Sequence, residues 1–136
     1  MILVDSNVLM YAAGASHPNK AESVALLDRI AKGEVEAALD AEVLQEILHR
    51  YRALGRWEQG RRVYDLSRRI IPVVVPVTAE VLDLSRALLD RHPRLTARDA
   101  LHAAVCKHAR LEAICSYDRD FDEIPGVKRL EPHAAV

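Results

Sequence analysis

The sequence has few cysteines, no long apolar run and almost no net charge. Its two cysteines, Cys106 and Cys115, stand in apolar surroundings without the close spacing of metal ligands, which predicts buried, reduced thiols. No apolar run approaches the roughly 18 residues of a membrane span, and the N-terminal "MILVD" has no basic region ahead of a long apolar one. We therefore expect a soluble, cytoplasmic protein without a membrane partner.

The overall charge and the absence of several motifs exclude further classes of protein function. Nineteen Lys and Arg residues against twenty Asp and Glu residues give a net charge of -1, so overall charge cannot bind polyanions indiscriminately. A function on nucleic acid must then depend on a local site. The phosphate-binding loops GxxxxGK[ST] and GxGxxG are absent, as are the zinc motif HExxH and the serine-nucleophile motif GxSxG.

Short apolar runs alternate with segments of helical periodicity along the whole chain. Strands are predicted at residues 1–4, 36–39, 73–75, 113–115 and 127–129, and the β-branched run 73–75 is expected to be buried. Helices are predicted at residues 8–13, 20–31, 41–54, 56–70, 79–90 and 96–109. This alternation favours an α/β fold in which helices cover both faces of a short, mostly parallel sheet. The length suits a single domain, residues 1–136.

Functional groups of open parallel sheets gather beyond the carboxyl ends of the strands. Asp5 and Asp118 occupy that position after two different predicted strands. Asp5 is interpreted equally well as the N-cap of the helix that follows it. Asp99 follows Thr96 by three residues, so "TARD" resembles a capping box, and an Asp in a first helical turn also points past the helix end.

A further acid lies on the predicted helix 41–54. Glu46 sits in "AEVLQEILHRY", where the neighbouring aliphatic residues form an apolar stripe. Its alternative interpretation is an exposed Glu paired with Arg50 one turn later, a contact worth only a few tenths of a kcal/mol. Glu42, one turn earlier, is the competing acid on the same face.

The stretch "SYDRDFDEIP" places four acids within six consecutive positions, Asp118, Asp120, Asp122 and Glu123. A calcium loop is excluded, because Glu123 stands where such a loop needs Gly and Arg129 stands where it needs Glu. We expect the apolar residues Phe121 and Ile124 to anchor the turn in the core. The last two acids are expected to face water.

The acids from separate elements, Asp5, Glu46, Asp99 and Asp118, have no obvious buried basic partner in the sequence. Such an oxygen-rich set suits Mg²⁺ or Mn²⁺, whereas zinc favours His and Cys. His102, one turn after Asp99, is expected to be a partly buried residue that supports the site without binding the metal directly.

Four spaced motifs resemble those of PIN-domain ribonucleases, specifically the VapC-type toxins of type II toxin-antitoxin systems. They are "MILVDSNVLMY", "VLQEILHRY", "TARDALHAAVCKH" and "SYDRDFDEIPGVKRL", in the family's order across nearly the whole chain. The resemblance implies a PIN-like three-layer α/β/α fold. It also implies that the catalytic acids are Asp5, Glu46, Asp99 and Asp118, and that Asp5, Asp99, Asp118 and Asp120 bind the metal. Asn7 and Ser116 match the family's supporting polar residues.

By the same resemblance, the protein is a bacterial or archaeal Mg²⁺- or Mn²⁺-dependent endoribonuclease whose products carry 5′-phosphate and 3′-hydroxyl ends. A VapB-type antitoxin would block the acidic site, and the family commonly forms homodimers. Arg50, Arg52 and Arg56 are candidates for RNA binding, although the solvated face of two helices is the favoured interpretation for any one of them.

Two other functions remain open. A phosphatase of the haloacid-dehalogenase type needs an Asp-x-Asp pair after the first strand, but the third position here is Asn7. A noncatalytic PIN module that acts through RNA or protein binding is the second alternative, which the complete set of four acids disfavours.

Overall fold

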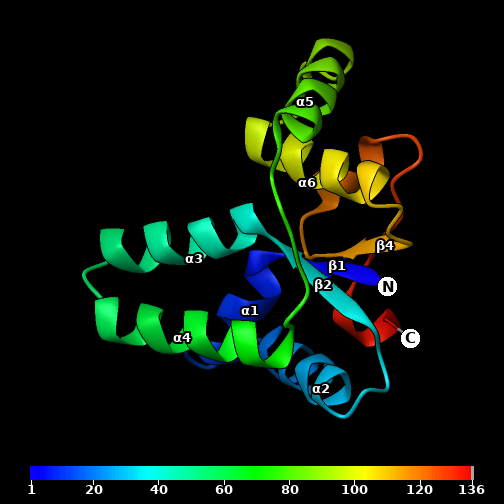
Figure 1. Cartoon of the computed structure of the whole chain (residues 1–136). Helices are drawn as coiled ribbons and strands as arrows, with labels where there is room; N and C mark the ends of the chain where they lie inside the picture. The colour runs from blue at the N-terminus through cyan, green and yellow to red at the C-terminus, as the bar shows by residue number, and fades with distance from the viewer. Residues whose placement is uncertain (136) are drawn as a thin grey trace.

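Five short strands form one parallel sheet in the computed structural model of the protein, which describes residues 1–135 (Figure 1). The strands lie in the order β3-β2-β1-β4-β5, and each neighbouring pair is parallel. Their bounds are β1 Ile2–Val4, β2 Ala37–Asp40, β3 Val74–Val75, β4 Ala113–Cys115 and β5 Arg129–Leu130. The predicted α/β fold with a parallel central sheet is confirmed.

Helices cover both faces of the sheet. They are α1 Ser6–Ala13, α2 Lys20–Ala31, α3 Ala41–Ala53, α4 Trp57–Ile70, α5 Ala79–Arg91 and α6 Ala97–His108, with the 3-10 turns η1 Arg119–Glu123 and η2 Pro132–Ala134. Because strand side chains alternate, Ile2 and Val4 join the core beneath α1 to α4, whereas Leu3 joins the core beneath α5 and α6. The result is three layers, with the α3/α4 and α5/α6 hairpins extending in different directions from the sheet (Figure 1).

Two strands lead directly into a helix through an aspartate cap. The side chain of Asp5 accepts a hydrogen bond from the backbone N–H of Ser6, and that of Asp40 accepts one from Val43 N–H at 2.8 Å. Each cap satisfies a backbone donor that the helix leaves free, and it fixes the carboxylate at the end of its strand. The C-terminal edge of the sheet therefore carries two fixed acids on adjacent strands.

Two predicted strands differ from the structure. The segment 73–75 was expected to be buried, but β3 lies at the edge of the sheet, Val74 and Val75 are only partly covered, and Val73 is 45% exposed. The last strand was expected at 127–129 but is Arg129–Leu130, because Gly126, with φ of 81°, carries the turn that precedes it.

The predictions for the cysteines and the acidic turn are confirmed. Cys106 and Cys115 are free thiols, and burial raises the pKa of each to about 12. Phe121 and Ile124 are buried in the core under α5 and α6. Among residues 1–135, no helix combines the length and apolar character needed to cross a membrane.

Candidate active site

Asp5 and Ser116 join the ends of β1 and β4. Asp5 is buried, with Oδ1 accepting from Ser6 N–H at 2.7 Å and Oδ2 accepting from the Ser116 hydroxyl at 2.6 Å. Burial raises the pKa of Asp5, while the charge of His102 and the hydrogen bond from Ser116 act in the opposite direction. The carboxylate is thus held in one orientation. Burial of its negative charge costs free energy, which a nearby cation would offset.

The Ser116 hydroxyl also connects two of the other expected residues. It accepts a hydrogen bond from Asn7 Nδ2 at 3.1 Å and one from the backbone N–H of Asp118 at 3.0 Å. The side chain of Asp118 in turn caps η1 by accepting from Asp120 N–H at 2.9 Å. This single buried hydroxyl therefore sets the positions of Asp5 and Asp118 relative to each other.

Asp99 and Asp118 form the second part of the site, together with Asp120. One carboxylate oxygen from each lies within 4.8 Å of the others. Burial, repulsion by Asp118 and a hydrogen bond to Asp118 raise the pKa of Asp99 to about 7, and the charge of Asp5 adds to this shift. The cap predicted for Asp99 is present, since its N–H donates to Thr96 Oγ1 at 3.2 Å.

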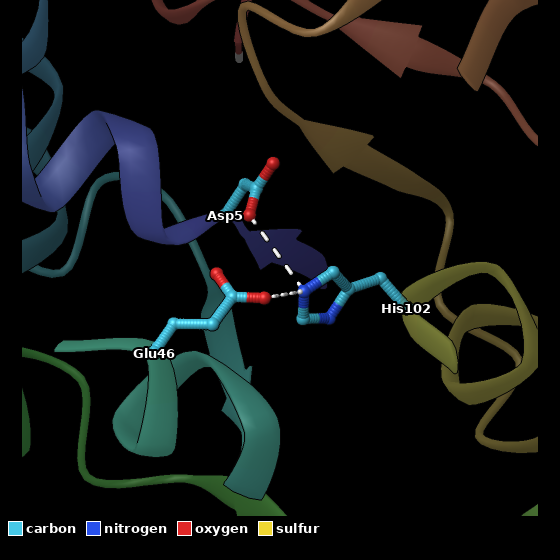
Figure 2. A group of neighbouring side chains, drawn as sticks. All are labelled: Asp5, Glu46 and His102. Carbon is cyan, nitrogen blue, oxygen red and sulfur yellow. Dashed lines mark hydrogen bonds and ion pairs between the residues drawn. The ribbon is translucent and has the colours of Figure 1, made fainter. Parts of the chain in front are cut away.

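Glu46 has a buried basic partner, contrary to our expectation from the sequence. It is 8% exposed, and its Oε1 lies 2.9 Å from Nε2 of His102 (Figure 2). His102 was expected to be partly buried but is only 1% exposed, because α6 packs it against the sheet. Its other ring nitrogen, Nδ1, lies 2.6 Å from Oδ2 of the fully buried Asp40.

Two further groups contact Glu46. The Ser6 hydroxyl donates to Oε2, and Nε of Arg98 lies 3.6 Å from Oε1. The alternative pairing of Glu46 with Arg50 does not occur among the described residues. Glu42 remains partly exposed outside this network, so the structure brings Glu46, and not Glu42, next to Asp5 and His102.

A groove of about 610 Å³ opens beside these acids. Among the described residues that line it, Glu46 is the one acid, beside Ser6 and Asn7, and Arg50, Arg56 and Arg98 supply cationic side chains. Arg52 is not among its lining residues, because its guanidinium stacks over the ring of Trp57 at 4.4 Å. The groove is therefore predominantly basic, and Glu46 connects it to the other acids of the site.

The sequence reasoning missed Asp40 and Arg98. Asp40 was detectable in principle, because "AALD" followed by a helix repeats the arrangement of "ILVD", in which Asp5 ends a strand. Arg98 lies directly before Asp99, but its approach to Glu46 depends on how α3 and α6 meet, which no local pattern shows. His102 was considered, and its link to two carboxylates was not foreseen.

The donor set fits a hard divalent cation. Asp99, Asp118 and Asp120 each offer a carboxylate oxygen within 4.8 Å of the others, and Asp5, grouped with Glu46 and His102, lies near enough for its charge to act on Asp99. Carboxylate oxygens are the ligands that Mg²⁺ and Mn²⁺ prefer. Burial and repulsion by Asp118 and Asp5 together raise the pKa of Asp99 to about 7. A bound cation would relieve that repulsion.

Comparisons with known proteins identify the family of the chain. The PIN-domain family profile matches residues 2–127. Ribonuclease VapC13 of Mycobacterium tuberculosis is 45% identical over 130 residues, which cover 96% of this chain and 99% of that protein. The crystal structure of VapC20 from the same organism, described as a toxin that cleaves the sarcin-ricin loop, superposes with a TM-score of 0.80 at 19% identity, covering 97% and 100% of the two chains.

A toxin-antitoxin complex from Klebsiella pneumoniae has the same fold, with a TM-score of 0.69 and 19% identity over 97% of this chain and 98% of that one. The extent of the profile match places the chain in the PIN-domain family. Within that family it belongs to the VapC ribonucleases, a class of RNA-cleaving hydrolases that act as toxins.

Proposed function

We propose that this VapC protein is an endoribonuclease that depends on Mg²⁺ or Mn²⁺ and cleaves RNA to 5′-phosphate and 3′-hydroxyl ends. The observation that carries the proposal is the convergence of Asp5, Asp99 and Asp118 beside a basic groove. Residues 1–136 act as one PIN domain. The protein acts in the cytoplasm, where its RNA substrate lies.

Asp5, Asp99, Asp118 and Asp120 are the residues that would hold the metal. When bound, a divalent ion lowers the pKa of a coordinated water and neutralises charge on the phosphate in the transition state. Ser116 keeps Asp5 and Asp118 in register through its three hydrogen bonds. Asn7 orients that hydroxyl from the α1 side.

The groove supplies the binding surface for the RNA backbone. Arg50, Arg56 and Arg98 offset the repulsion between the acids of the site and the RNA phosphates. Because water would attack the phosphorus, the 2′-hydroxyl of the RNA has no role as the nucleophile. Single-stranded or loop RNA is the expected substrate, selected by contacts at the protein surface. Arg52, stacked on Trp57, supports the helical hairpin and contributes a more distant positive charge.

A VapB-type antitoxin is the proposed regulatory partner, supported by the fold shared with a toxin from a toxin-antitoxin complex. Its binding would cover the acidic site and stop cleavage. Free toxin would then inhibit translation or growth by destroying RNA. A homodimer is the proposed assembly.

The test is cleavage of total cellular RNA by purified protein in Mg²⁺, compared with EDTA and with the variants Asp5→Asn and Asp99→Asn. Wild type should cleave only with metal, and both variants should lose at least about a hundredfold in rate. Equal cleavage by all three proteins would refute the proposed site. Absence of cleavage with RNA binding intact would favour a noncatalytic PIN module.

A further inference from the structure

The side of the groove formed by α1 carries an aromatic ring close to the acidic site. Asn7, Tyr11 and Gly14 line the groove at helical spacing, so they lie on one face of α1. Asn7 donates a hydrogen bond to the Ser116 hydroxyl, within the acidic site. Tyr11 lies one helical turn beyond Asn7, a distance of roughly 6 Å along the helix axis.

The side of the groove formed by α3 carries a cation at the matching position. Arg50 lies one helical turn beyond Glu46, and both side chains line the groove. Because α1 and α3 follow the adjacent strands β1 and β2, both helices begin at the same edge of the sheet, and the Ser6 hydroxyl on α1 donates to Glu46 on α3. One turn beyond this contact, the groove therefore presents the ring of Tyr11 and the guanidinium of Arg50.

Tyr11 belongs to a cluster of three rings that hydrogen bonds hold in place. Its ring stacks on His17 with 4.4 Å between centroids and meets the ring of Tyr117 edge-on at 5.3 Å. The Tyr117 hydroxyl donates to the Asn19 carbonyl at 3.0 Å and lies 2.8 Å from Ser23 Oγ, and Asn19 N–H donates to His17 Nδ1 at 3.0 Å. Tyr11 is only partly buried and His17 is exposed, so a ligand can reach rings that are already fixed.

We infer that the stacked pair Tyr11 and His17 is a platform for an unpaired RNA base close to the scissile phosphate, while Arg50 binds a phosphate at the same level of the groove. Every base has a π-face, and aromatic rings beside a cationic groove bind single-stranded RNA through stacking and charge together. A base within a duplex is already stacked, so the platform favours single-stranded or loop RNA. The inference rests on the proposed RNA-cleaving function and names the part of the substrate that the groove recognises.

The experiment measures binding of two fluorescein-labelled probes to the full-length chain by fluorescence anisotropy, in EDTA so that metal-dependent cleavage does not occur. The adenosine probe is an oligoribonucleotide of about eight adenosines, and the base-free probe has the same ribose-phosphate backbone without bases. Wild type should bind the adenosine probe about tenfold more tightly than the base-free probe, because only the first can stack. Duplex RNA should bind wild type and Tyr11→Leu within about twofold of each other.

Variants separate stacking from charge. Tyr11→Leu should bind the adenosine probe about tenfold more weakly and the base-free probe within about twofold of wild type, whereas Tyr11→Phe, which keeps the ring, should bind both like wild type. His17→Ala should weaken only the adenosine probe, by about threefold. Arg50→Gln should weaken both probes by the same factor. Tyr64→Leu is the matched control, since Tyr64 is also partly buried but is not among the described residues that line the groove.

Equal or undetectable binding of the two probes by wild type would overturn the inference, as would undiminished binding of the adenosine probe by Tyr11→Leu. A Tyr11→Phe variant as weak as Tyr11→Leu would also overturn it, because the hydroxyl and not the ring face would then be responsible. If Tyr11→Leu does not fold, His17→Ala decides: a loss confined to the adenosine probe supports the platform, and any other result overturns it. A wild-type protein that distinguishes the probes but cleaves no RNA in Mg²⁺ would refute the proposed function alone.

Discussion

Asp99 at the start of α6 and Asp118 after β4 approach so closely that Asp118 helps to raise the pKa of Asp99 to about 7. The proton that this pair retains must leave before a cation can take its place. Metal affinity should therefore depend on pH near neutrality, above the usual range of a carboxyl group.

Mn²⁺ binding should weaken by roughly tenfold between about pH 8 and about pH 6, because most Asp99 carboxyls regain a proton over that interval. Isothermal titration calorimetry at the two pH values measures this change. Asp118→Asn should make the dependence less steep, since burial still raises the pKa of Asp99 in this variant but the added repulsion by Asp118 is gone. An equally steep dependence in that variant would contradict our assignment of the shift.

The same pKa affects the stability of the metal-free protein. Between about pH 4 and about pH 7 the folded chain keeps the Asp99 proton while the unfolded chain has lost it, so the free energy of unfolding falls as pH rises through this window. Asp99→Asn should thus stabilise the metal-free protein at about pH 8 by ~1–2 kcal/mol, after allowance for solvent screening.

Thermal unfolding of Asp99→Asn and wild type in EDTA checks this expectation. At about pH 4 the two proteins should unfold at similar temperatures, because the Asp99 carboxyl of wild type is then largely protonated in the folded state and substantially protonated in the unfolded state. A variant less stable than wild type at pH 8 would show that Asp99 is a structural residue.

Ser116→Ala should reduce kcat by about ten- to a hundredfold, because the hydroxyl orients both Asp5 and Asp118. Cleavage rates at saturating Mg²⁺ provide the measurement. Ser67→Ala is the matched control, since that buried hydroxyl donates only to the Val63 carbonyl within α4. Similar losses in both variants would point to a general packing defect.

Arg50→Gln should raise KM for RNA by about fivefold with little change in kcat, because its charge lies in the groove away from the reacting acids. The effect should shrink as salt concentration rises, which a series of KM measurements will show. Arg61→Gln provides the control, since Arg61 is exposed and pairs with Glu58 on the surface of α4.

Gly60→Ala should destabilise the protein by ~1–3 kcal/mol, although Ala is the better helix former by about 1 kcal/mol. A Cβ at this position would lie 2.5 Å from Cβ of Tyr51, at the contact between α3 and α4. Denaturant unfolding measures the loss. A stability equal to wild type would mean that the two helices separate easily.

The fold was predictable because its signals are local. Short apolar runs predicted β1 and β4, and helical periodicity located helices α1 to α6 within a few residues. The edge position of β3 was not predictable, because a valine run looks the same at an edge and in the centre of a sheet.

The acids of the site were identified from their motifs, and the structure brings them to one edge of the sheet. Their catalytic roles remain predictions. The link from His102 on α6 to Asp40 and Glu46, at the start of α3 and within it, spans 62 and 56 positions of the chain, and no spacing rule connects residues so far apart. Burial of polar groups is a property of packing, so the contacts of His102 with these two carboxylates are visible only once α6 is placed against the sheet.

Mapping the ends of RNA cut by wild type in Mg²⁺ tests the central claim most directly. We predict 5′-phosphate and 3′-hydroxyl ends, formed by attack of water, and loss of these products in EDTA and in Asp99→Asn. Products with 2′,3′-cyclic phosphate ends, or cleavage that persists in EDTA, would contradict metal-dependent hydrolysis at this site.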